Sequence, residues 1–179
     1  MATTTNKTSE YKVVGTRPIR PDGIDKVTGR AKFGLDYQAV GLLQAKVLRS
    51  PHAHARIKSI DVSKALQYPG VKAVITSSDL PDAPEGTVSV GEGPNVNLKF
   101  MRTAILASDK VLYRGHPVAA VAAVSLHVAE EALDLIEVEY ELLPALLTAP
   151  EAMSDSAVVL HESMTTVSGG MDTGKNSNV

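Results

Sequence analysis

The stretch SLHVAEEALDLIEVEYELLP, residues 125–144, decides the fold because its hydrophobic period changes midway. From residue 137 onward, glutamates alternate with apolar residues, which is the period of a strand with one face in water. The first part instead carries apolar side chains at the spacing of one helical face: Val128, Ala129, Ala132, Leu133 and Ile136. Ser125 can cap this helix. The sequence therefore predicts one main helix near 126–136 that runs directly into a strand.

Most of the chain on the N-terminal side of this stretch predicts strands. Short β-rich runs separated by Pro, Gly and Ser are typical of strands joined by tight turns. The runs are AKFGLDY (31–37), LLQAKVLRS (42–50), RIKSIDV (56–62), VKAVIT (71–76), KVLY (110–113) and VAAVAAV (118–124). Only short helical turns are expected between them, at 63–67, 77–81 and 150–153, and residues 81–96 read as a loop. Strands outnumber helices without regular alternation, so the fold class is α+β with a mixed sheet.

The ends of the chain differ in composition from its middle. Residues 1–13 are polar and predict a disordered arm, and 163–179 predict a flexible polar tail or an interdomain linker. The tail contains GGMDTGK (169–175), which has phosphate-loop spacing but lacks the hydroxyl residue and the helix that such a loop needs.

Composition excludes several classes of function. The formal net charge is −2 and the basic residues are scattered, so no nucleic acid partner is expected. Apolar runs are too short to cross a membrane and no apolar signal segment is present, so a cytoplasmic location is expected. Cysteine is absent, which excludes disulfides, thiolate zinc sites, a cysteine nucleophile and iron–sulfur ligation by this chain.

Two closely spaced histidines raise the possibility of a metal site. His52 and His54 lie in RSPHAHARI (49–57), and in an extended strand both imidazoles would face the same way. Zinc needs three or four protein ligands, so His116, His161 or a carboxylate would have to complete the set. The alternative is a structural corner set by Ser50 and Pro51, in which ring nitrogens bond to backbone. The structural corner is the favoured interpretation.

The remaining motifs favour structural interpretations. HESM (161–164) lacks the second histidine of a zinc-protease helix, because residue 165 is threonine. GEGPNV (91–96) has only part of a dinucleotide-binding turn and reads as a surface loop. His116 lies in a turn, and no hydroxyl or carboxylate residues near it in the sequence form a catalytic group with it. A structural or interface role is therefore favoured over an acid–base role. His127 is expected on the wet side of the helix.

Taken in order, several of these segments resemble one known family. The segments are GTRPIRPDGIDKVTGRAKFGLD, LLQAKVLRSPHAHARIKSIDVSKALQYPGVKAVITSSDLP and KVLYRGHPVAAVAAVSLHVAEEALDLIEVEYELLPA. Together they resemble the N-terminal α/β-hammerhead domain in the large subunit of molybdenum hydroxylases, over about residues 14–162. That family contains xanthine dehydrogenase, aldehyde oxidase and aerobic carbon monoxide dehydrogenase. RSPHAHARI, PGVKAVIT and VEYELLPA carry the resemblance most strongly.

The resemblance implies a role for a whole enzyme and none for an individual residue here. Such an enzyme hydroxylates an aldehyde, N-heterocycle or related small substrate at a molybdenum–pterin cofactor, and electrons leave through [2Fe-2S] clusters and FAD. These groups are expected on other domains or subunits, so no catalytic, cofactor-binding or metal-binding residue carries over to this chain. Implied partners are the molybdopterin-binding domains of the same large subunit and the iron–sulfur and flavin subunits.

Two interpretations of the chain stay open at this point. It can be the N-terminal domain or a fragment of such an oxidoreductase, in which case the 179 residues alone are expected to be inactive. Alternatively, it is a standalone, non-enzymatic docking or assembly module for such an enzyme. Both predict an exposed apolar surface where the partner would pack.

Overall fold

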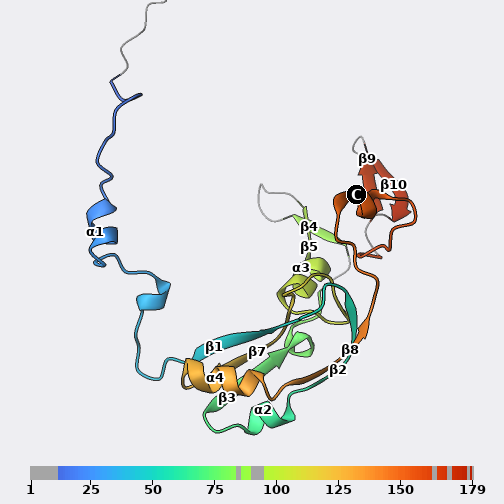
Figure 1. Ribbon diagram of the computed structural model, residues 1–179, viewed down its shortest axis with the longest axis horizontal. Coiled ribbons are helices and arrows are strands. Elements are labelled where there is room, and N and C mark those ends of the chain that lie inside the picture. Colours follow the sequence, from blue (N-terminus) through green and yellow to red (C-terminus); the bar gives the residue numbers. More distant parts are fainter. Residues whose placement is uncertain are drawn as a thin grey trace, which may run out of the picture. The chain divides into compact units, whose positions relative to one another are not determined.

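A computed structural model describes residues 12–83, 86–89, 95–162, 165–168, 171–176 and 178 (Figure 1). The chain divides into two units, one ending at Val40 and one beginning at Gly41. Residues 1–11 of the predicted N-terminal arm lie outside the described residues. The predicted arm, domain and tail boundaries therefore stay predictions.

The N-terminal unit contains two short helical segments, α1 (Gly23–Val27) and the 3₁₀ turn η1 (Gly34–Asp36). The strand predicted over 31–37 is therefore wrong. The Asp36 carboxylate accepts a hydrogen bond from the Phe33 backbone N–H at 2.9 Å. A short polar side chain that bonds to nearby backbone favours a turn over a strand ladder, which explains the difference.

The first sheet of the second unit contains three strands in the order β1 (Gln44–Arg49), β7 (Pro117–Ala123) and β3 (Val71–Thr76). Both pairings are antiparallel. β7 consists of alanines and valines after its first proline, and its central position explains why that run is apolar without a break. The strands predicted at 42–50, 71–76 and 118–124 are confirmed.

The second sheet has the order β6 (Lys110–Val111), β2 (Ala55–Asp61) and β8 (Glu137–Leu142). Residues 50–54 form a corner that carries the chain from β1 in the first sheet to β2 in the second. The strand predicted at 56–62 is present, but it is not a hairpin partner of β1. It pairs with β8, with Ile57 opposite Tyr140 and Asp61 opposite Glu137.

Two further strand pairs complete the described sheets: β4 (Thr87–Ser89) with β5 (Asn95–Asn97), and β9 (Thr165–Ser168) with β10 (Met171–Asn176). The α+β class is confirmed. In one respect the strands differ from the mixed sheet that was expected, because every pairing among the described residues is antiparallel. Antiparallel sheets tolerate water on one face, which fits the alternating glutamates of β8.

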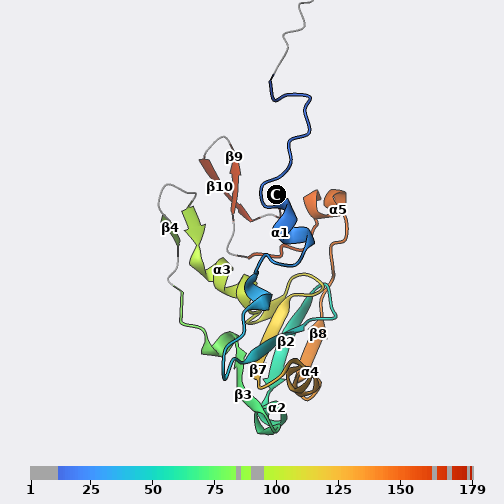
Figure 2. The ribbon, with the colours of Figure 1, turned by 90° about the vertical axis from the view of Figure 1, so that its left-hand side faces the viewer.

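The main helix predicted near 126–136 is α4 (Leu126–Leu133), and it continues through a short turn into β8. The Ser125 hydroxyl accepts the Val128 N–H at 3.2 Å, so the predicted cap is confirmed. α4 contacts all three strands of the first sheet, and α2 (Ser63–Gln67) lies beside it (Figure 2). The short turns predicted at 77–81 and 150–153 correspond to η2 (Ser77–Asp79) and α5 (Ala149–Met153).

A second helix as long as α4 was not predicted. α3 (Leu98–Ile105) begins after Asn97, whose side-chain oxygen accepts the backbone N–H groups of Lys99 and Phe100. Asn97 is therefore an N-cap. The helix is short, and it follows a Pro- and Gly-rich run that reads as loop, which explains why its periodicity was overlooked.

Small side chains dominate the core between α4 and the first sheet. Ala129 and Ala132 of α4 pack with alanines and valines of β7, and all of them are fully buried. A second cluster forms around Val111 and Val118 and includes side chains of β2 and β8. Among the described residues, no helix is long and apolar enough to span a membrane.

Gly70, at the turn before β3, gives a prediction about backbone conformation. Its φ is +93°, and an added Cβ would lie 3.0 Å from Val124 Cγ2. Gly115 has a similar φ of +88°, but an added Cβ would meet nothing within 4 Å. We expect Gly115→Ala to lower the free energy of unfolding by about 1 kcal/mol through backbone strain, and Gly70→Ala to cost more because of the added contact. Urea unfolding of both variants measures the difference; equal losses would contradict the crowding at Gly70.

Candidate functional site

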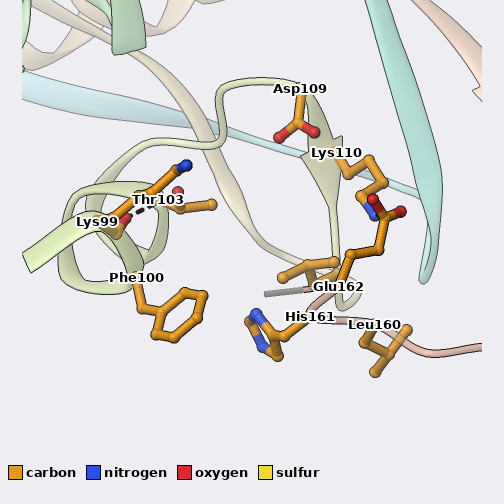
Figure 3. A pocket seen from close by; sticks show the side chains of 9 residues that line it. Lys99, Phe100, Thr103, Asp109, Lys110, Leu160, His161 and Glu162 are labelled. Carbon is orange, nitrogen blue, oxygen red and sulfur yellow. Dashed lines mark hydrogen bonds and ion pairs between the residues drawn. The ribbon is translucent and has the colours of Figure 1, made fainter. Parts of the chain in front are cut away.

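One cavity of the described residues lies where three distant segments meet (Figure 3). α3, the region around β6, and residues 160–162 surround a volume of about 300 Å³. Its lining residues are Lys99, Phe100, Thr103, Asp109, Lys110, Leu112, Leu160, His161 and Glu162. Two lysines, two carboxylates and a histidine at one cavity make it the natural place to look for chemistry.

An ion pair joins two of the charged side chains in this cavity. Lys110 Nζ lies 2.8 Å from a carboxylate oxygen of Glu162, and the two side chains point toward each other in Figure 3. The Lys110 hydrogen bond holds the pKa of Glu162 below its ordinary value. The Thr103 hydroxyl donates to the Lys99 carbonyl oxygen within α3. Neither the carboxylate nor the hydroxyl is therefore arranged as a general base or an activated nucleophile.

His161 is held as a neutral ring in the same cavity. Its ring meets Phe100 edge-on, with ring centroids 5.1 Å apart (Figure 3). Burial lowers the pKa of His161, and the nearby Lys110 ammonium lowers it further. The ring therefore ties residues 160–162 to α3 through aromatic packing.

His116, in the turn before β7, is only 1% exposed. Its Nδ1 accepts the Leu112 backbone N–H at 3.1 Å, and its Nε2 is 2.9 Å from the Thr103 carbonyl oxygen. These two contacts select the neutral tautomer in which Nε2–H donates. The ring also stacks on the Tyr113 ring, with the two ring centroids 4.4 Å apart. The contacts support the structural interpretation of His116.

The structure places His52 and His54 in the corner before β2, not within a strand, so the two rings do not share a face. Nδ1 of the buried His54 donates to the Pro144 carbonyl oxygen at 2.6 Å. The His52 ring instead packs edge-on against Tyr140, with centroids 5.0 Å apart. Among the described residues, no group of three or more His, Cys, Asp or Glu side chains could hold a metal ion.

The other singled-out motifs do not come together at the cavity, apart from His161 and Glu162 of HESM. Residues 163 and 164 of that motif, 91–94 of GEGPNV, and 169–170 of GGMDTGK lie outside the described residues. The rest of GGMDTGK belongs to strand β10, where a phosphate loop would need a turn and a helix. His127 is exposed on α4 and lies 3.3 Å from Glu131, as the wet-side prediction required.

Sequence reasoning missed Lys99, Phe100 and Lys110 as cavity residues. The Asn97 cap was the available signal for α3, but no local pattern reveals that this helix meets residues 160–162. As a whole, the arrangement is a junction held by one ion pair and one contact between aromatic rings. It contains no evident catalytic constellation.

Comparison with known proteins identifies the family to which this chain belongs. The model of the aldehyde oxidase and xanthine dehydrogenase a/b hammerhead domain matches residues 28–144. The chain therefore belongs to this hammerhead domain family, and the resemblance drawn from the sequence is confirmed.

Individual relatives agree with the family match. The carbon monoxide dehydrogenase large chain of Afipia carboxidovorans is 37% identical over 166 residues, which cover 89% of this chain and 19% of the relative. The xanthine dehydrogenase molybdenum-binding subunit of Escherichia coli O157:H7 is 36% identical over 143 residues, or 80% of this chain and 19% of the relative. The chain thus spans about a fifth of the length of these curated relatives.

The solved structures show the same relationship. The reconstituted CO dehydrogenase from Oligotropha carboxidovorans matches with a TM-score of 0.65 and 37% identity, covering 81% of this chain and 17% of that chain. The predicted hammerhead fold is therefore confirmed by the likeness of the structures as well as by sequence.

The buried, neutral His116 gives a prediction about pH. Burial lowers the pKa of His116, so the folded protein protonates this ring at lower pH than the unfolded chain does. Neutral His116 contributes fully to stability at pH values above the pKa of histidine in the unfolded chain, about 6.5. This contribution is lost as the pH falls from there toward the pKa of His116 in the folded protein. His161 acts in the same direction.

We expect the free energy of unfolding to fall between about pH 7 and about pH 5, by up to about 1.4 kcal/mol per pH unit for each such histidine. His116→Gln should flatten this slope relative to the wild-type protein. Urea titrations at several pH values measure the slope. An unchanged slope in His116→Gln would contradict the assignment.

The divergent rings of His52 and His54 give a prediction about zinc. Because they serve different neighbours, His52→Ala should leave the affinity of the chain for Zn²⁺ unchanged in calorimetric titration. A loss of about tenfold or more, the size typical of removing a partner at a metal site, would restore the metal interpretation.

Proposed function

We propose that the chain serves as the hammerhead domain of a molybdenum hydroxylase large subunit. In this proposal, the complete enzyme hydroxylates an aldehyde, an N-heterocycle or a related small substrate. The observation that carries the proposal is the family match over residues 28–144, together with relatives named as large chains and molybdenum-binding subunits.

The role of this domain in the enzyme is packing, and the chemistry lies elsewhere. Without cysteine, the chain cannot hold an iron–sulfur cluster by thiolates. The side chains of the described part do not form a donor set that fits a metal. We therefore place the molybdenum–pterin cofactor, the [2Fe-2S] clusters and FAD on other domains or subunits. No residue of this chain is proposed as catalytic, cofactor-binding or metal-binding.

The partners follow from the same reasoning. The domain, proposed to span residues 14–162, would pack against the molybdopterin-binding domains and neighbour the iron–sulfur and flavin subunits. We propose the cytoplasm as the location, and propose no membrane or nucleic acid partner. The second candidate is a standalone docking module. The ion pair in the cavity beside α3 is compatible with this role, because it gives the cavity a packing function and no catalytic one.

The mass and metal content of the native polypeptide test this proposal. We expect an antibody against residues 41–162 to capture, from the native host, a complex that contains molybdenum and iron by elemental analysis. A denatured polypeptide several-fold heavier than 18.9 kDa would identify a large subunit, and one of about 18.9 kDa in the same complex would identify the docking module. Capture of the polypeptide without molybdenum would contradict both candidates.

A further inference from the structure

The first sheet has one apolar face that α4 does not cover. Six side chains form it, and we call them the alanine face: Ala45, Val47, Ala73, Ile75, Ala120 and Ala122. Strand register arranges them in two rows across the sheet. Ala122 of β7 lies opposite Ala45 of β1 and Ala73 of β3, and Ala120 lies opposite Val47 and Ile75.

The residues that alternate with these six along the strands show that the alanine face points away from α4. Lys46 Nζ lies 2.6 Å from Glu130 of α4, so Lys46 points toward the helix. Because side chains alternate along a strand, Ala45 and Val47 point the opposite way. Val74 packs into the core beneath α4, and this places Ala73 and Ile75 on the same outer face.

The alanine face is unlike a sheet surface made for water. Val47 is 39% and Ile75 41% exposed, and none of the six residues is charged. The exposed face of β2 and β8 instead carries Arg56, Asp61, Glu137, Glu139 and Glu141. This contrast within one domain marks the alanine face as a contact surface, because exposed apolar patches on soluble proteins commonly mark interaction sites.

We propose that the alanine face is the surface against which the cofactor-bearing remainder of the large subunit packs. This inference rests on the proposed function. The relatives contain about four-fifths of their length outside the region matched here, which supplies a partner surface of sufficient size. The occupant is an uncharged, apolar surface, because an ion placed on these six side chains would lose its hydration and find no counter-charge. Because alanine side chains are short, long apolar side chains of the partner can pack closely against this face.

The absence of cysteine makes a direct test possible, since one introduced thiol is unique in the chain. Ala45→Cys and Ala73→Cys place that thiol on the alanine face, and Ser59→Cys places it on the exposed side of β2 as a matched strand control. Each variant is made in the native host and as the isolated 179-residue chain, with circular dichroism to confirm folding. Maleimide labelling is read from the mass of the peptides of this chain, so thiols on other subunits do not interfere.

We expect Ala45→Cys and Ala73→Cys to label at least about tenfold more slowly in the molybdenum-containing complex than in the isolated chain, because burial restricts reagent access to local opening events. Ser59→Cys should label at similar rates in both. Loss of molybdenum from the complex in the two alanine variants, but not in Ser59→Cys, would also support the assignment, since it would show that the face is needed for assembly.

Other outcomes overturn the inference in distinguishable ways. A complex that forms with the alanine face labelled as fast as in the isolated chain would reject the face and leave the proposed function intact. Slow labelling of these cysteines in the isolated chain would mean that other residues of the chain already cover the alanine face. If labelling slows further as the protein concentration rises, a second copy of the chain covers it. If wild-type protein forms no molybdenum-containing complex, the proposed function and this inference fail together.

Discussion

Close packing of small side chains between α4 and β7 is the interaction on which the rest of the domain depends. Ala129 and Ala132 meet Ala119, Val121 and Ala123, and all five are fully buried. Because these side chains are small, the helix lies close to the sheet, and larger residues at these positions would force the two layers apart. α4 therefore covers one face of the first sheet and leaves the other face available.

The corner at residues 50–54 divides the strands between two sheets. The Ser50 N–H donates to the His116 carbonyl oxygen at 2.9 Å, and the Gly115 N–H donates to the Ser50 carbonyl oxygen at 2.9 Å. His54 then anchors the corner to Pro144, two residues after the end of β8. The backbone groups of Ser50, which leave the first sheet, thus find hydrogen-bond partners in the turn before β7.

These features are those of a domain whose main exposed feature is a surface for packing against another protein surface. The cavity beside α3 is lined by the ion pair between Lys110 and Glu162 and by the Phe100–His161 contact, whereas the uncovered side of the first sheet is apolar. Family membership agrees with this division, since the matched domain is a minor part of much longer relatives. Within it, the rings of His54 and His116 bond to the backbone carbonyls of Pro144 and Thr103.

The sequence by itself determined the family and most of the local elements, although it missed α3 and misassigned residues 31–37. The periods of 3.6 and 2 in residues 125–144 predicted α4 and β8, because helix and strand repeats depend only on neighbours along the chain. Cysteine content alone excluded thiolate chemistry. The tertiary structure decided which strands share a sheet, that α3 meets His161, and that His52 and His54 diverge. Those facts depend on contacts between residues distant in sequence, which carry no local periodic signal.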